Sequence, residues 1–378
     1  MTELPATNLT MLTLVKDSGE LEISLTRRPM PEPKDHEVIV KIMATPINPS
    51  DLGLLVGGAD MSTARVSERD GLPVVTVDVP PAGMRAMSGR IGEPMAIGNE
   101  GCGLVVAAGA SDAAQALVGK TVALIGGEIY AEYRCLPAAM CMLLPEGTDA
   151  KDGASCFVNP LTSLAFTELM RSEGHKAIVH TAAASNLGQM LVKICAKDGI
   201  PLVNIVRSDA QVALLKGIGA THIVNSGGET FIDDLTAAIV ATEATLGFDA
   251  IGGGKLAGQI LGCMEVAAVK RATSYSRYGS DTFKQVYIYG GLDMSPTILN
   301  RSFGLTWALS GFLLTPFMTK AGPEVVGRMR KRVVDELGTT FKSHYSHEIS
   351  LTEALKLDVL MAYNAKRTGE KYLILPQS

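Results

Sequence analysis

The sequence has few aromatic residues and no long block of charge of one sign. Phe, Trp and Tyr make up 5% of the 378 residues, and charged residues make up 19%. The 34 basic and 39 acidic residues are spread along the chain and give a net charge of −5. Nucleic acid and acidic membrane surfaces are therefore not expected partners.

Cysteine pairs with C-x-x-C spacing are also missing. Of the six cysteines, Cys102, Cys156, Cys195 and Cys263 lie among small and apolar residues, as buried thiols do. This usage predicts reduced cysteines without disulfides, and hence a cytoplasmic location. The amino terminus lacks a basic region followed by an apolar run, so no signal peptide is expected.

Long hydrophobic runs are few. The longest uncharged stretch, residues 302–319, contains several Ser and Thr residues and Pro316. It falls short of the roughly 20 predominantly apolar residues of a membrane-spanning helix. We predict a buried core helix there.

The length and the hydrophobic content of 47% favour two domains. Residues 1–158 contain many short strand-like runs punctuated by Gly and Pro, which indicate a partly open β-barrel. Residues 159–320 alternate apolar strands with helical stretches, which predicts a doubly wound α/β domain with a parallel sheet. Its strands are expected near residues 177–181, 202–206, 221–225, 248–251 and 286–290.

Residues 321–378 and residues 58–97 differ in pattern from the two domains described above. Residues 321–378 are predicted to form helices over 323–337 and 351–362 and a closing strand over 371–375 that rejoins the first domain. Residues 58–97 show little periodicity apart from a short apolar run, which predicts a long loop. This loop either covers a cleft and shapes an acceptor pocket, or packs on the barrel as a surface insertion.

The region around residue 180 has the pattern of a dinucleotide site. A buried strand at 177–181 is followed by a turn of small residues, a helix and a second strand ending at Arg207. Such a turn presents backbone N–H groups at a helix N-terminus to a pyrophosphate. Proteins that prefer NAD usually carry an acidic residue at the end of the second strand, whereas arginine suits a 2′-phosphate. The expected cofactor is therefore NADPH, although a plain strand-to-helix turn and a solvated arginine are the alternatives.

The turn departs from the ideal G-x-G-x-x-G pattern. Its three glycine positions are occupied by Ala183, Ser185 and Gly188, all of them small. Ser185 or Asn186 is expected to add a side-chain donor to the phosphate, beside Leu187 in the first turn of the helix.

Four motifs together resemble the medium-chain dehydrogenase/reductase superfamily, in its zinc-independent branch of quinone oxidoreductases and 2-enoyl thioester reductases. I-N-P-S-D at 47–51 resembles the N-P-x-D turn of that branch, and G-N-E-G-C-G-L-V-V at 98–106 resembles its G-x-E-x-x-G-x-V strand. N-P-L-T-S-L-A at 159–165 is similar to the helix that opens its nucleotide domain, and residues 180–189 are similar to its phosphate turn. The resemblance covers nearly the whole chain apart from 58–97.

The resemblance implies a GroES-like barrel domain (1–158 and 321–378) and a Rossmann domain (159–320) that binds NADPH. It implies that Asn48 and Thr162 border the nicotinamide and its ribose. Further cofactor-binding positions implied by it are Ala183, Ser185, Asn186, Leu187, Gly188, Arg207, Ser208, Gly252, Gly253, Tyr289, Gly290, Gly291, Leu292 and Lys371. Members of the branch often dimerise through edge strands, and residues 284–290 and a helix through Trp307 are the candidate contributors to a homodimer.

The resemblance also bears on metal. Zinc-dependent relatives place ligands at positions where this chain has Asn48, Asn99, Glu100 and Val158. The six histidines are scattered, and a tetrahedral site needs three or four N or S ligands. We predict that the protein holds no metal.

The chain departs from the enoyl thioester reductases at the position of their proton donor. Enoyl thioester reductases carry a tyrosine where this chain has Ala59. This absence favours a quinone or another small activated carbonyl or alkene as the acceptor, because a hydroquinone anion takes its proton from water. An enoyl thioester reductase with another donor is an alternative, from Tyr130, Tyr133, Tyr275 or Tyr278, or with Asp51 or Glu100 as acid or base. A non-catalytic NADPH-binding sensor is the other alternative.

Overall fold

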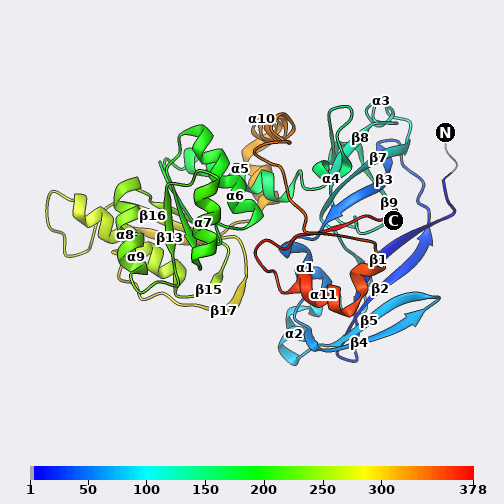
Figure 1. Ribbon diagram of the computed structural model, residues 1–378, viewed down its shortest axis with the longest axis horizontal. Coiled ribbons are helices and arrows are strands. Elements are labelled where there is room, and N and C mark those ends of the chain that lie inside the picture. Colours follow the sequence, from blue (N-terminus) through cyan, green and yellow to red (C-terminus); the bar gives the residue numbers. More distant parts are fainter. Residues whose placement is uncertain (1–3) are drawn as a thin grey trace. The chain divides into compact units, whose positions relative to one another are not determined.

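The computed structural model describes residues 4–378, which form two compact units (Figure 1). Unit 1 comprises residues 4–158 and Val333–Ser378, and unit 2 comprises Asn159–Arg332. The second boundary lies within helix α10 (Leu314–Asp335) and not after residue 320. Among residues 4–378, no helix combines the length and the hydropathy that a bilayer crossing requires.

Unit 1 is built mainly from short strands arranged in two sheets. The first sheet has the order β4-β5-β2-β1-β6, and the second has the order β10-β8-β7-β3-β20-β19, with β9 paired to β3. Its strands are β1 (Thr7–Val15), β2 (Glu20–Pro29), β3 (Glu37–Pro46), β4 (Asp60–Arg69), β5 (Leu72–Asp78), β6 (Met95–Ala96), β7 (Glu100–Ala108), β8 (Thr121–Ile125), β9 (Tyr133–Pro137), β10 (Cys141–Leu143), β19 (His347–Ile349) and β20 (Tyr372–Ile374). Its helices are α1 (Pro49–Leu55), α2 (Pro81–Ala86), η1 (Ser88–Arg90), α3 (Asp112–Gln115), η2 (Ala138–Met140), α4 (Ala150–Gly153), η3 (Glu353–Leu355) and α11 (Leu357–Asn364).

The predicted return of the chain to the first domain is confirmed. Strand β20 pairs antiparallel with β3, and β19 pairs parallel with β20. The predicted helix over 351–362 is replaced by the short η3 and by α11. Side chains of η3 and α11, among them Leu355 and Leu360, complete the core formed by β1, β2 and β5. The core of unit 1 therefore includes side chains of the carboxy-terminal segment, from η3 and α11.

The prediction of a loop over 58–97 is wrong. This segment forms the β4–β5 hairpin, α2, η1 and β6, and β5 pairs with β2. Val75 and Val77 of β5 lie in the main core of unit 1. Because this segment builds the sheet and its core, deleting part of it would expose that core.

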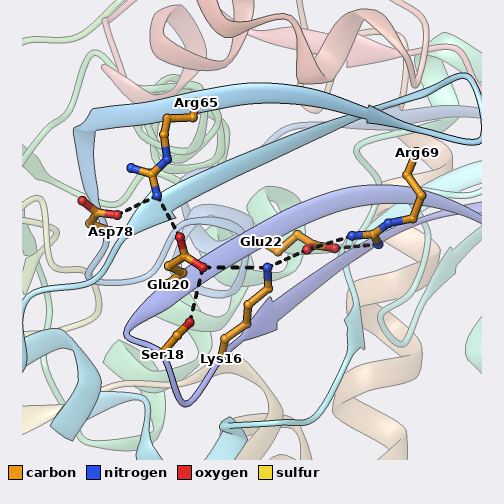
Figure 2. Close-up of polar contacts among 7 residues, drawn as sticks. All are labelled: Lys16, Ser18, Glu20, Glu22, Arg65, Arg69 and Asp78. Carbon is orange, nitrogen blue, oxygen red and sulfur yellow. Dashed lines mark hydrogen bonds and ion pairs between the residues drawn. The ribbon is translucent and has the colours of Figure 1, made fainter.

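Ion pairs join the hairpin to the strands beside it (Figure 2). The Arg65 guanidinium contacts Glu20 at 2.9 Å and Asp78 at 2.8 Å, and the Arg69 guanidinium contacts Glu22 at 2.8 Å. Strand β4 lies at the edge of its sheet, and most of its side chains are exposed. Charged side chains on an edge strand oppose pairing with another chain. The ion pairs therefore fix the hairpin while its outer edge stays polar.

Unit 2 is a doubly wound parallel sheet with the order β13-β12-β11-β14-β16-β18. Its strands are β11 (Ile178–His180), β12 (Leu202–Val206), β13 (His222–Asn225), β14 (Leu246–Asp249), β16 (Lys284–Ile288) and β18 (Trp307–Gly311), and β15 (Gly252–Gly254) pairs separately with β17 (Asp293–Thr297). Its helices are α5 (Val158–Ser172), α6 (Asn186–Asp198), α7 (Asp209–Gly217), α8 (Phe231–Thr242), α9 (Leu256–Arg271) and α10. The five predicted strands are confirmed, with ends that shift by a few residues.

Alternation along each strand builds a core on both faces of this sheet. Val179 and Val203 pack with side chains of α8 and α9, whereas Ile178 and Leu202 pack with side chains of α5, α6 and α7. Strands covered on both faces read as continuous apolar runs, which is why the sequence predicted them well.

The prediction of a buried helix over 302–319 is wrong. Residues 307–311 form β18, and helix α10 begins only at Leu314. Trp307 therefore begins a strand that pairs with β16 and lies at the edge of the sheet. The predicted helix over 323–337 is the second part of α10, after a kink where Gly322 has a φ of +83°.

The hairpin offers a matched pair of substitutions. Val66 of β4 and Val75 of β5 are cross-strand partners, but Val66 is 56% exposed and Val75 is fully buried. We predict that Val75→Ala lowers the free energy of unfolding of unit 1 by about 2 kcal/mol, because it removes two buried methyl groups and leaves a cavity. Val66→Ala should change it by less than about 0.5 kcal/mol. Urea unfolding of both variants tests this, and equal effects would show that the hairpin contributes no core.

Candidate functional site

The predicted dinucleotide residues of unit 2 follow the carboxyl ends of its parallel strands. The turn 182–188 follows β11, Arg207 follows β12, and Gly252 and Gly290 follow β14 and β16. Because these strands run parallel and in register, the four segments all lie on the side of the sheet where the strands have their carboxyl ends. The strand order reverses between β11 and β14, and ligands of open α/β sheets bind at such a point.

The turn before α6 is as tight as a phosphate turn requires. A Cβ atom added to Gly188 would lie 2.2 Å from the Ala183 carbonyl oxygen, so only glycine fits there. The Ser185 hydroxyl caps α6 by accepting the Gly188 N–H at 3.1 Å. Among the described residues, no group accepts the Leu187 N–H in the first turn of α6. A helix N-terminus with an unused N–H group attracts anions.

Arg207 is an exposed cation next to this turn. Its backbone N–H donates to the Gln211 side chain at 3.0 Å, and Ser208 caps α7. Within residues 4–378, the Arg207 guanidinium itself has no hydrogen-bond or ion-pair partner. Since β11 and β12 are adjacent, the guanidinium lies on a strand end beside the turn.

A buried carboxylate shapes the loop after β14. Asp249 is fully buried and accepts the Thr181 hydroxyl at 2.8 Å and the Ile251 N–H at 2.9 Å. The Gly252 N–H donates to its other oxygen at 3.2 Å. A Cβ atom added to Gly252 would lie 2.7 Å from the Gly290 carbonyl oxygen. Asp249 therefore ties the segment after β14 to Thr181 at the end of β11, and Gly252 lets the segment after β16 approach closely. The sequence analysis singled out neither Asp249 nor Thr181.

A second buried contact at this edge joins β11 to β16. The His180 imidazole Nε2 lies 2.7 Å from the Tyr289 hydroxyl, and burial lowers the pKa of His180 to about 3. The Phe166 ring of α5 stacks edge-on against Tyr289 with 4.9 Å between centroids. Thr162 lies one turn before Phe166 on the same buried helix. The His180 and Phe166 rings thus hold Tyr289 next to the end of β11.

In unit 1, Asn48 is held by a fully buried carboxylate. Asn48 caps helix α1, and its side-chain amide donates to Glu100 Oε1 at 2.7 Å. The other oxygen of Glu100 accepts the backbone N–H groups of Phe157 and Val158 at 2.8 and 2.9 Å. Burial raises the pKa of Glu100, while these hydrogen bonds favour the carboxylate. Glu100 therefore ties the N-P-x-D turn to the end of the first part of unit 1.

Asp51 completes this turn. Its carboxylate accepts the Asn48 N–H at 2.7 Å and the Asn99 N–H at 2.9 Å. Burial raises the pKa of Asp51 to about 7, and the two hydrogen bonds oppose this rise. An acid with that pKa exchanges its proton near neutral pH.

Lys371, the last of the predicted positions, lies in the same unit. Its ammonium group donates to the Ser155 hydroxyl oxygen at 2.9 Å, and the Tyr345 hydroxyl donates to the same oxygen at 2.9 Å. Burial lowers the pKa of Lys371 to about 8, although the Glu100 and Asp51 carboxylates raise it. The sequence pointed to Lys371 but gave no signal for Ser155 or Tyr345.

The predicted residues thus fall into two sets. Unit 2 brings together the turn residues Ala183, Ser185, Asn186, Leu187 and Gly188, the strand-end residues Arg207, Ser208, Gly252, Gly253, Tyr289, Gly290, Gly291 and Leu292, and Thr162 on α5. Unit 1 brings together Asn48 and Lys371 around Glu100. Over the part of the chain that the structure describes, no group of three or more His, Cys, Asp or Glu is placed to hold a metal ion.

The chain is similar to reductases of known sequence, although no family model matches it. It is 30% identical to prostaglandin reductase-3 of Mus musculus over 199 residues, which are 52% of this chain and 45% of that protein. It is 25% identical to a mitochondrial enoyl-[acyl-carrier-protein] reductase of Arabidopsis thaliana over 311 residues, 78% of this chain and 69% of that protein. The chain spans about half the length of the first of these relatives.

A solved structure resembles the whole chain. A protein of Mesorhizobium loti described as an NADPH:quinone reductase superposes with a TM-score of 0.74 and is 26% identical. The similarity covers 99% of this chain and 100% of that one. Both units therefore share their fold with that protein.

The raised pKa of Asp51 predicts a pH dependence of stability. Between its ordinary value of 3.8 and about 7, the folded protein holds a proton on Asp51 that the unfolded chain has lost. This contribution to the free energy of unfolding therefore falls as pH rises from about 4 to 7, and it is constant above 7. Asp51→Asn removes the titration, so this variant should gain stability relative to the wild type between pH 5 and pH 8.

Urea unfolding at both pH values measures this difference. Asp60→Asn is the control, because Asp60 is exposed and its hydrogen bonds to Ser62 lower its pKa. The difference in the free energy of unfolding between Asp60→Asn and the wild type should be the same at pH 5 and pH 8. A constant difference between the wild type and Asp51→Asn would mean that Asp51 titrates below pH 5.

Proposed function

The chain belongs to the medium-chain dehydrogenase/reductase superfamily, and on this premise we propose that it is an NADPH-dependent reductase of quinones or other small activated carbonyls and alkenes. The exposed Arg207 guanidinium at the end of β12 is the single observation that carries the choice of cofactor. The names of the similar reductases agree with a reductase activity.

The residues of unit 2 fit the dinucleotide. The tight turn at Gly188 and the unused Leu187 N–H form a cradle for the pyrophosphate, with the Ser185 and Asn186 side chains beside it. Arg207 and Ser208 would hold the 2′-phosphate, because a guanidinium pairs with phosphate in a bidentate fashion. When bound, NADPH supplies the hydride.

The remaining predicted positions would hold the rest of the cofactor. The loops carrying Gly252 and Gly253 and residues 289–292 lie at the edge of the sheet, where the cofactor would extend past the strand ends. Asn48 and Thr162 would border the nicotinamide and its ribose, and Lys371 would contact the cofactor. The Glu100 carboxylate fixes the Asn48 side chain by accepting its N–H, which leaves that amide pre-organised for a ligand.

The position of the missing tyrosine supports a quinone-type acceptor. Ala59 follows helix α1 and packs against the core, and it carries no proton to donate. The Tyr130 hydroxyl donates to the Pro46 carbonyl at 3.2 Å, and burial raises its pKa. Tyr275 and Tyr278 lie exposed after α9 in unit 2. An acceptor whose reduced form takes its proton from water suits this arrangement.

We also propose that the enzyme works without zinc and as a homodimer in the cytoplasm. Asn48 and Glu100 hydrogen-bond to each other where zinc-dependent relatives carry ligands. The prediction that residues 284–290 pair between subunits is wrong, because β16 lies between β14 and β18. Strand β18 instead has one described neighbour, so its other edge suits a second copy of the chain. All six cysteines are free thiols, as a reducing compartment requires.

An acceptor panel tests the proposed function. The purified protein, NADPH and a series of quinones, enones and enoyl thioesters should show loss of cofactor absorbance with quinones and small enones. Faster turnover of enoyl thioesters would favour the enoyl reductase alternative. Tight NADPH binding with no turnover of any acceptor would favour a sensor.

Arg207→Ala tests the choice of cofactor. We predict that it weakens NADPH binding by about 1.5–3 kcal/mol, the range for hydrogen bonds to charged groups, and that it leaves NADH binding almost unchanged. Fluorescence titration with both cofactors gives the two affinities. Lys216→Ala, which removes an exposed cation from the end of α7, is the control and should change neither. Equal losses for NADPH and NADH in Arg207→Ala would contradict the assignment.

A further inference from the structure

Unit 1 holds a lysine whose surroundings suit proton transfer. Resting on the proposed function, we propose that Lys371 protonates the reduced acceptor, in place of the tyrosine that this chain lacks, and that Ser155 and Tyr345 hold its ammonium group in position.

The ammonium group is fixed by two contacts from distant parts of the chain. It donates to the Ser155 hydroxyl oxygen at 2.9 Å and lies 5.5 Å from the centre of the Tyr345 ring. The Tyr345 hydroxyl donates to the same Ser155 oxygen at 2.9 Å. Ser155 is only 1% exposed, so this oxygen is a buried hydrogen-bond acceptor for both groups. The backbone of Lys371 is held too, because its N–H donates to the Ser346 hydroxyl at 2.9 Å.

Two of the three ammonium hydrogens have no acceptor among the described residues. Across residues 4–378, the bond to Ser155 is the only hydrogen bond that the Lys371 side chain makes. An ammonium group taken partly out of water without acceptors is costly, because each unmade hydrogen bond leaves its desolvation uncompensated. A ligand oxygen would satisfy these donors.

The same carboxylate connects Lys371 to Asn48. Glu100 accepts the Asn48 amide at 2.7 Å and attracts the Lys371 ammonium group electrostatically. Both side chains belong to unit 1, so this relation does not depend on unit 2. On the proposed function, Asn48 borders the nicotinamide, and the proposal places the Lys371 ammonium group at the same end of the cofactor.

The protonation state of Lys371 suits an acid that works near neutral pH. Burial lowers its pKa to about 8, against the charges of Glu100 on β7 and Asp51 on α1, which raise it. On its other side lies the Tyr345 phenol, whose pKa burial raises, and which therefore stays neutral. An acid is most effective when its pKa lies near the working pH. Tyr345 keeps its proton and serves as a positioning residue.

The proton from Lys371 would complete the reduction of an enone. A hydride, with its electron pair, reaches the β-carbon of an enone, the C=C pair moves to form the enolate, and the nicotinamide is oxidised. Lys371 then gives one proton from Nζ to the enolate and becomes a neutral amine. The Ser155 hydroxyl can turn to donate to that amine, and water restores the ammonium ion. A quinone needs this step less, because its hydroquinone anion is stable enough to take a proton from water.

Lys371→Met in the full-length protein tests the proposal with two acceptors. The enone rate should fall about 100-fold, within the range for one general acid, whereas the quinone rate should fall much less. In the wild type the enone rate should decline above pH 8, and this alkaline limb should disappear in the variant. Lys356→Met, at an exposed lysine that pairs with Glu353, is the control and should leave both rates within twofold.

A measurement that needs no turnover accompanies it. With lysine labelled at the ε-carbon, one NMR resonance of the wild type should titrate near pH 8 and be absent from Lys371→Met. Ser155→Ala and Tyr345→Phe should each change the pKa of that resonance. In each variant the pKa of the alkaline limb of the enone rate should shift by the same amount as the pKa from NMR.

The outcomes separate this proposal from the proposed function. Wild-type protein that reduces neither acceptor refutes the proposed function and this step with it. A wild type that reduces both, with equal losses for both acceptors in Lys371→Met, leaves the function standing and refutes the role of Lys371. A Lys371 resonance that titrates near the ordinary lysine pKa of about 10.4 also refutes the role of Lys371.

Discussion

The Glu100 carboxylate is the constraint on which the arrangement of unit 1 depends. It is fully buried and accepts the Asn48 amide and two backbone N–H groups at the end of the first part of the unit. A buried carboxylate is tolerated only with such partners. Losing any of its three donors would leave part of the buried charge uncompensated, so these donors are held in place. The nearby Lys371 ammonium group is a counter-charge to it. The N-P-x-D turn and the carboxy-terminal return of the chain are thereby drawn to one place in the fold.

In unit 2, buried groups and glycines shape the segments that follow the carboxyl ends of the strands. Asp249 satisfies the backbone of the loop after β14 from inside, and Gly188 and Gly252 let neighbouring backbones approach more closely than any side chain allows. The loops are therefore shaped without side chains that would fill the edge of the sheet. Arg207 is the exception: its side chain is exposed, and within residues 4–378 its guanidinium has no hydrogen-bond or ion-pair partner.

The sequence predicted unit 2 better than unit 1 for a physical reason. Strands buried on both faces, such as β12, appear as short apolar runs between helical patterns. Strand β4 has mostly exposed polar side chains, so its hairpin looked like a loop. Strand β18 lay in an apolar stretch that periodicity alone cannot assign to helix or strand.

The candidate site was predicted where a motif marked it, and missed where only the fold creates it. Arg207 and Asn48 stand in local patterns. Ser155 and Lys371 are 216 residues apart in the sequence, and no sequence pattern near either residue predicts their hydrogen bond. Asp249 gave a weaker signal, a lone acid at the end of an apolar strand, which a search for buried charges would have found.

A crystal structure of the protein with NADPH tests the central claim most directly. We expect the Arg207 guanidinium within about 2.7–2.9 Å of a 2′-phosphate oxygen, and the Asn48 amide still hydrogen-bonded to Glu100 beside the nicotinamide. A guanidinium turned into solvent while the 2′-phosphate is bound elsewhere would contradict it.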